Sequence, residues 1–154
     1  MKVLFVCTGN TCRSVMAEAI FNSYCNEKNI FALSAGLSVI PDSIASQNAV
    51  EVVEQNLNIN LSNRKAIQID KEIIENSDVI LVMTSYIKDI IKKYFPKYSD
   101  KIFTLNDYIG VSGDISDPFG GNIEVYQNTF FELKNKIFLL IGKIKEDKGI
   151  FKEY

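Results

Sequence analysis

The chain alternates short, uninterrupted apolar runs with longer segments in which apolar residues recur every three or four positions. Uninterrupted runs are typical of parallel strands covered on both faces, and the periodic segments are typical of helices. We expect strands at 3–7, 30–35, 79–83 and 101–105, and helices at 17–25, 43–56, 70–77, 86–95 and 123–146. Because right-handed crossovers place helices on both faces of parallel strands, this order predicts a doubly wound α/β fold.

The sequence also indicates the start of the last helix and one long connection before it. Asn122 is expected to be the N-cap of the last helix, and Phe130, Phe131 and Phe138 are expected on its inward face. Residues 106–121 form the one long segment without regular structure, and such segments inside a compact domain are usually functional or mobile.

Size and charge narrow the functional classes. A chain of 154 residues, of which 47% are apolar, predicts a single domain over residues 1–154. The net charge of −2 argues against nucleic acid or an anionic membrane surface as a partner. No apolar run approaches the length of a membrane span. The three cysteines show no CxxC spacing, which favours reduced thiols and a cytoplasmic location.

The chain contains no histidine. This excludes most zinc sites, every Ser–His or Cys–His catalytic pair, and the usual general base at neutral pH. An enzyme with this sequence must work with carboxylates, thiols, arginine, hydroxyl groups and backbone amides.

Residues 7–14 read Cys-Thr-Gly-Asn-Thr-Cys-Arg-Ser and link the first expected strand to the first expected helix. In that position, successive backbone N–H groups freed by Gly9 can surround a tetrahedral oxyanion at the positive end of the helix dipole. The planar guanidinium of Arg13 can hold two phosphoryl oxygens at once. The same positive groups favour the thiolate form of Cys7, which then needs no histidine as an activating base.

The Cys-x5-Arg spacing by itself is weak evidence. The alternative is a tight turn in which Cys7 is a core residue and Arg13 a solvated charge. An arginine in the first turn of a helix opposes the helix dipole, so this alternative is less favourable. A second candidate is Asp117, which Pro118 follows in the long connection; Asp-Pro is also an ordinary turn sequence.

These segments resemble the low-molecular-weight protein tyrosine phosphatase family. The resemblance spans the whole chain and includes the loop 7–14, Met16-Ala17-Glu18, Ser34-Ala35-Gly36, the strand 79–83 and Asp117-Pro118. It implies a four-stranded parallel sheet in the order 2-1-3-4. It also implies catalysis through a cysteinyl-phosphate intermediate, with no cofactor and no metal.

The resemblance assigns roles to individual residues. Cys7 is the nucleophile, and Asp117 is the general acid of the first step and the general base of the second. Ser14 stabilises the Cys7 sulfur as a leaving group, and Ser34 supports the loop together with Asn10. Phosphate and substrate are expected to contact Thr8, Gly9, Asn10, Thr11, Cys12, Arg13, Ser14 and Phe119.

Thr11 bears on the substrate. Tyrosine-directed relatives commonly carry an apolar residue at this place, whereas a hydroxyl suits a polar, planar leaving group. Together with the sequence around Asp117, Thr11 makes the chain most similar to the bacterial protein arginine phosphatase branch. Protein phosphoarginine is therefore favoured over phosphotyrosine as the substrate, with inorganic phosphate as a product.

Three residues depart from the family pattern. Val15 replaces a proline, Phe119 replaces a common tyrosine, and Asn63 stands roughly where the family has a histidine that supports the loop. Cys12 could form a reversible disulfide with Cys7 or could simply be buried, and Cys25 is expected in the core.

Three other functions are less consistent with this sequence. An arsenate reductase needs two further cysteines to relay electrons. A non-catalytic module that binds phosphate groups would not need both Cys7 and Asp117. A flavodoxin-like domain needs flavin-binding loops in place of the loop at residues 7–14.

Overall fold

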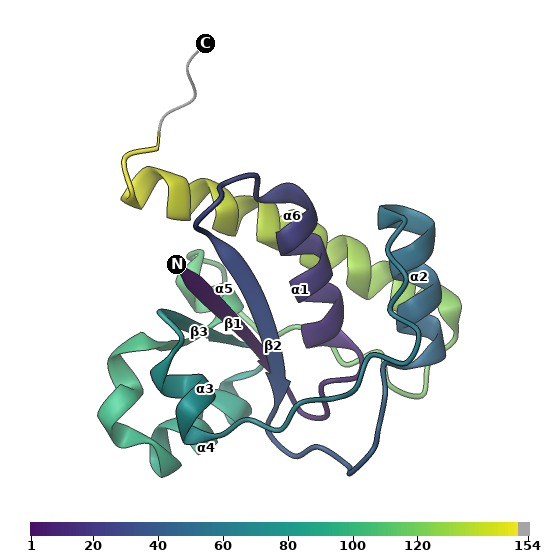
Figure 1. The fold of residues 1–154 in the computed structure, drawn as a ribbon, viewed down its shortest axis with the longest axis horizontal. Coiled ribbons are helices and arrows are strands. Elements are labelled where there is room, and N and C mark those ends of the chain that lie inside the picture. Colours follow the sequence, from purple (N-terminus) through teal and green to yellow (C-terminus); the bar gives the residue numbers. More distant parts are fainter. Residues whose placement is uncertain (151–154) are drawn as a thin grey trace.

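A computed structural model describes residues 1–150 as a four-stranded parallel sheet with helices on both faces (Figure 1). The strands are β1 (Lys2–Cys7), β2 (Phe31–Gly36), β3 (Val79–Val82) and β4 (Ile102–Thr104). Their order in the sheet is β2-β1-β3-β4. The expected fold class and strand order are thereby confirmed.

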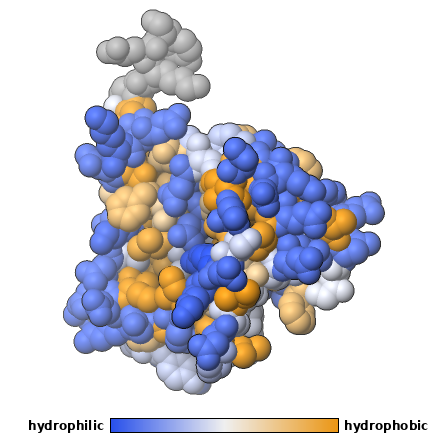
Figure 2. Space-filling view, turned by 45° about the vertical axis from the view of Figure 1, so that its right-hand side comes forward, coloured by the Kyte–Doolittle hydropathy of each residue, from blue (hydrophilic) through white to orange (hydrophobic). Residues whose placement is uncertain are grey.

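The helices form two layers. They are α1 (Arg13–Tyr24), α2 (Gln47–Leu57), α3 (Lys71–Glu75), α4 (Ser85–Tyr94), α5 (Leu105–Tyr108) and α6 (Ile123–Asp147), and a 3-10 helix spans Pro96–Lys101. In Figure 1, α1, α2 and α6 lie on one side of the sheet, and α3 and α4 lie on the other. On the molecular face drawn in Figure 2, apolar side chains occur in separate groups between polar ones.

The alternating side chains of β1 supply both apolar cores. Val3, Phe5 and Cys7 pack into the cluster that contains the buried residues of α1 and α6, while Leu4 and Val6 pack with α3 and α4. Because both faces of β1 are covered, its uninterrupted apolar sequence is explained. Cys7 is the last residue of this strand and is buried.

The second helix begins later than expected, because contacts with other segments hold residues 43–46 in a non-helical conformation. Helix α2 begins at Gln47, and the side chain of Ser46 caps it by accepting a hydrogen bond from the backbone N–H of Ala49. Residues 43–46, expected to be helical, are not. Ile44 instead forms an isolated bridge with Lys65 and stays partly exposed.

Two further expectations for the second half of the chain are corrected. Phe130 is fully buried on α6, but Phe131 and Phe138 are 48% and 43% exposed, so the inward stripe is narrower than expected. Asn122 caps α6 as expected by accepting from the N–H of Val125. The 106–121 segment is not wholly irregular, because α5 (Leu105–Tyr108) runs into it.

The segment after α5 is fixed to the sheet. The side-chain amide of Asn106 donates to the carbonyl of Gly113 at 2.7 Å, and the N–H of Ile115 donates to the carbonyl of Met83 at 2.9 Å. Met83 directly follows β3, and Ile115 is buried. Asp117, two residues after Ile115, therefore lies near the carboxyl end of the sheet, where β1 also ends. Within residues 1–150 no helix is long and apolar enough to cross a membrane.

Candidate active site

The loop between β1 and α1 turns sharply around a buried asparagine. Asn10 has a φ of 54°, in the left-handed region that asparagine tolerates better than most residues. The neighbouring Gly36 at the end of β2 allows the loop to approach closely. A Cβ atom at Gly36 would lie 2.9 Å from the Asn10 nitrogen and 2.7 Å from a methyl group of Val39, so a larger residue would push the loop away.

Polar side chains connect the buried Cys7 thiol to this turn. The Ser14 hydroxyl lies 2.9 Å from the Cys7 sulfur. The side-chain amide of Asn10 donates to the Ser14 hydroxyl at 2.8 Å and to the Ser34 hydroxyl at 3.0 Å. The side chains that the resemblance placed around the loop are thus in contact, and a hydroxyl is in position to stabilise the sulfur anion.

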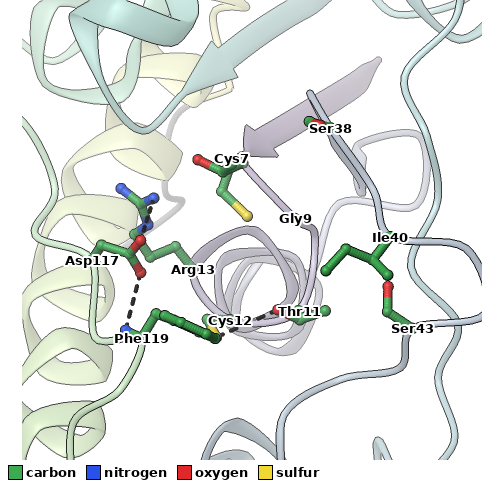
Figure 3. A pocket seen from close by; sticks show the side chains of 11 residues that line it. Cys7, Gly9, Thr11, Cys12, Arg13, Ser38, Ile40, Ser43, Asp117 and Phe119 are labelled. Atoms are coloured by element: carbon green, nitrogen blue, oxygen red, sulfur yellow. Dashed lines mark hydrogen bonds and ion pairs between the residues drawn. The ribbon is translucent and has the colours of Figure 1, made fainter.

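The side chains of Arg13 and Asp117 lie next to each other on one side of Cys7 (Figure 3). Their side chains lie 3.4 Å apart, and Arg13 also donates to the carbonyl of Ile115 at 2.9 Å. The Arg13 side chain is buried, whereas that of Asp117 is 51% exposed and so is reachable by a leaving group. The other carboxylate oxygen of Asp117 accepts from the N–H of Phe119 at 3.1 Å, which orients the carboxylate.

A pocket of about 240 Å³ opens above Cys7. Among the predicted site residues, those that line it are Cys7, Thr8, Gly9, Thr11, Cys12, Arg13, Asp117 and Phe119. Asn10, Ser14 and Ser34 are buried and lie outside its lining. Phe119 and Ile40 form opposing walls and are 79% and 74% exposed, so an incoming side chain can contact both.

Arg64, which the sequence interpretation missed, supports the loop from below. Its guanidinium donates to the side-chain amide oxygen of Asn10 at 2.8 Å, to the Ser34 hydroxyl at 2.8 Å and to the Glu18 carboxylate at 2.9 Å. We expected Asn63 roughly at the position of the family's supporting histidine; in residues 1–150 it is the neighbouring Arg64 that makes these hydrogen bonds. The available signal was Glu18 in the Met-Ala-Glu sequence, since a partly buried carboxylate needs a cationic partner.

Arg64 and the backbone together fix the strained conformation of the turn. The Asn10 side-chain oxygen accepts from Arg64 and from the N–H of Ile67 at 2.9 Å, while its amide donates to Ser14 and Ser34. The hydrogen-bonding capacity of this asparagine is therefore filled. A fully satisfied buried network rigidifies its surroundings, so we infer that Arg64 orients the loop through Asn10.

Replacing Arg64 with methionine is expected to lower kcat by about 10- to 100-fold, because Asn10 loses a charged donor and Glu18 loses its partner. The rate at which iodoacetamide alkylates Cys7 should fall as well, which a purely structural defect in a folded protein would not cause. Lys65→Met removes a neighbouring exposed cation and serves as the control. A folded Arg64→Met protein with normal kcat would contradict this role.

Cys12 has a different environment from Cys7. Its sulfur lies 3.2 Å from the Tyr126 hydroxyl and donates to the Ser46 hydroxyl at 3.4 Å. Burial and the contact with Cys12 raise the pKa of Tyr126 to about 12, so the tyrosine stays protonated. The three cysteines are unpaired and buried, and Cys25 lies in the core as expected. A disulfide between Cys7 and Cys12 stays a prediction.

Comparison of the sequence with known proteins identifies the family to which the chain belongs. Residues 2–149 match the family model described as low molecular weight phosphotyrosine protein phosphatase. The chain belongs to this family. It is 40% identical over 152 residues to a protein-arginine-phosphatase of Bacillus subtilis, covering 96% of this chain and 99% of the relative.

Two further relatives bear on the site. The chain is 38% identical to the low molecular weight protein-tyrosine-phosphatase PtpB of Staphylococcus epidermidis, covering 94% of this chain and 97% of the relative. A structure of the YwlE arginine phosphatase, a mutant with a phosphorylated active-site serine, superimposes with a TM-score of 0.91 at 40% identity. It covers 98% of this chain and 100% of that one. Both substrate types therefore occur among the relatives of this phosphatase-family chain.

Proposed function

We propose that this chain is a cysteine-dependent protein phosphatase that hydrolyses phosphoarginine in proteins through a cysteinyl-phosphate intermediate. The main support for this type of reaction is that Cys7, Arg13 and Asp117 line one pocket. The structure of the phosphorylated active-site serine in the YwlE mutant supports a covalent intermediate at the corresponding place.

In the first step, the Cys7 sulfur forms a bond to phosphorus while the bond from phosphorus to the guanidinium nitrogen breaks. Arg13 and the loop amides stabilise the negative charge on the phosphoryl oxygens. Asp117 gives its proton to the leaving nitrogen, which would otherwise depart as a strong base. The substrate phosphate competes with Asp117 for Arg13, since the two side chains are paired in this structure.

In the second step, a water molecule attacks phosphorus and the sulfur–phosphorus bond breaks. Asp117 accepts a proton from the water, which restores its acid form and releases inorganic phosphate. The Ser14 hydroxyl, 2.9 Å from the sulfur, stabilises the thiolate that leaves. Each group is thus returned to its starting state.

Phosphoarginine is favoured by Thr11 and by the relatives. The Thr11 side chain lies on the pocket wall, where its hydroxyl can accept a hydrogen bond from a guanidinium N–H group. Relatives named protein-arginine-phosphatase come from Bacillus subtilis and Geobacillus stearothermophilus, each 40% identical. The substrates of this chain are then phosphorylated proteins. Its three unpaired cysteines suit the reducing environment of the cytoplasm.

Phosphotyrosine is the second candidate substrate. The exposed side chains of Phe119 and Ile40 provide apolar walls that could pack on a phenol ring. The ratio of kcat/KM for phosphoarginine and phosphotyrosine in peptides of one sequence decides between the candidates. A ratio below one would overturn the proposed substrate and leave the mechanism intact.

The position of Cys25 argues against an arsenate reductase, which passes electrons between cysteines that lie close together. Cys25 follows the last residue of α1, whereas Arg13 begins this helix at the pocket. The length of the helix separates the two ends by roughly 18 Å at 1.5 Å per residue. Cys25 is therefore too far from Cys7 to receive electrons through a direct disulfide.

Replacing Thr11 with isoleucine is expected to shift the kcat/KM ratio toward phosphotyrosine by about tenfold or more. The change removes a hydrogen-bond acceptor for the guanidinium and adds apolar surface for the ring. The measurement compares both phosphopeptides on the wild type and on the variant. An unchanged ratio would remove Thr11 as a basis for the substrate assignment.

A further inference from the structure

The segment between β2 and α2 forms one wall of the pocket, and backbone hydrogen bonds connect both of its ends to the loop at residues 7–14. At the start, the N–H of Leu37 donates to the carbonyl of Cys7 at 2.9 Å. At the end, the N–H of Ser46 donates to the carbonyl of Thr11 at 3.0 Å. The wall is therefore fixed relative to the nucleophile.

A tight turn in this wall determines the place of Ser43. The N–H of Ser43 donates to the carbonyl of Ile40 at 3.1 Å. Pro41 occupies the second position of the turn, and Asp42, with a φ of 63°, occupies the third, as in type II turns. The carbonyl of Ser43 accepts from the N–H of Ala66 at 2.9 Å. Both backbone polar groups of Ser43 are thus satisfied.

The side chain of Ser43 is not satisfied. Its hydroxyl oxygen is buried and has no hydrogen-bond partner within residues 1–150, although Ser43 lines the pocket. Figure 3 shows this oxygen directed toward the end of the Ile40 side chain, which offers no polar atom. Buried polar groups are paired in most folded proteins, so an unpaired hydroxyl on a pocket wall suggests a missing ligand.

Ile40 can uncover this hydroxyl. Its side chain is largely exposed, and exposed side chains change rotamer rapidly. A substrate side chain that enters between Ile40 and Phe119 can therefore displace the tip of Ile40 and reach the Ser43 oxygen.

The proposed substrate carries the matching group. Phosphoarginine presents guanidinium N–H donors beyond its phosphate, whereas phosphotyrosine presents an aromatic ring without a donor there. We infer that Ser43 is a specificity-determining residue whose hydroxyl accepts a hydrogen bond from the guanidinium of phosphoarginine. This inference rests on the proposed function and adds a second hydroxyl to that of Thr11.

Ser43→Ala tests the inference in the full chain. We expect kcat/KM for a phosphoarginine peptide to fall by about tenfold, and that for a phosphotyrosine peptide of the same sequence to stay within about twofold. The melting temperature should be unchanged or raised, because the variant removes an unpaired buried hydroxyl. Ser62→Ala, at an exposed serine outside the pocket lining, is the matched control.

The outcomes separate this inference from the proposed function. An equal loss on both peptides, no loss on either, or a lower melting temperature of Ser43→Ala would overturn the role of Ser43. A wild-type protein that fails to hydrolyse phosphoarginine would overturn the proposed substrate, and with it the inference, before any variant is measured. A selective loss on phosphoarginine with an unchanged or raised melting temperature supports the inference.

Discussion

Replacing Cys7 with serine is expected to lower kcat by about 10⁴-fold or more, the largest effect of any single change in this protein. Without a general base, a serine hydroxyl is a weaker nucleophile than a thiolate, and a serine phosphate releases its alkoxide far less readily in the second step; the chain has no histidine to assist either step. The Ser14 hydroxyl lies 2.9 Å from the Cys7 sulfur but is itself a weak base.

The measurement is turnover of an aryl phosphate and of both phosphopeptides, together with binding of inorganic phosphate. Binding should persist in Cys7→Ser, because Arg13 and the loop amides are unchanged. Cys25→Ala removes a core thiol far from the pocket and controls for general damage. Equal rates for wild type and Cys7→Ser would reject an enzyme that uses this sulfur and would favour a binding module.

Replacing Asp117 with alanine is expected to reduce kcat by about 10²- to 10³-fold for phosphoarginine and for alkyl phosphates. Both leaving groups need a proton as the bond to phosphorus breaks, and Asp117 faces the pocket as the exposed partner of Arg13. The loss should be much smaller for p-nitrophenyl phosphate, whose leaving group is stable as an anion.

A plot of log kcat against the basicity of the leaving group reveals this difference as a steeper slope for Asp117→Ala. Asp114→Ala is the matched control, since Asp114 lies on the same segment but accepts from the N–H of Ser85, away from the pocket. If Asp117→Ala slowed good and poor leaving groups equally, the carboxylate would orient Arg13 or the loop rather than donate a proton.

The chemistry of the loop was predictable because it is local. Cys7, Gly9 and Arg13 lie within one short strand–loop–helix segment, so their spacing alone places a thiol, a flexible turn and a cation around one point. The alternation of apolar runs and periodic segments likewise determined the sheet and its helices, since burial on two faces leaves a distinct pattern. The family resemblance, rather than the spacing, supplied the strand order and the role of Asp117.

Contacts between distant segments decided the rest. Arg64 reaches Asn10 and Glu18 across long sequence separations, and no periodicity marks such a partner. Residues 43–46 had a helical pattern, but backbone hydrogen bonds to Thr11 and Arg64 hold them outside α2.

The sequence by itself therefore determined the alternation of strands and helices, and it determined that a thiol, a turn and a cation share the loop at residues 7–14, where neighbouring residues act together. Only the tertiary structure decided that Arg64 supports the loop, that Arg13 pairs with Asp117, and that the Ser43 hydroxyl is left unpaired on the pocket wall. The physical reason is that hydrogen-bond satisfaction depends on which groups meet in space, and chain order does not encode that locally.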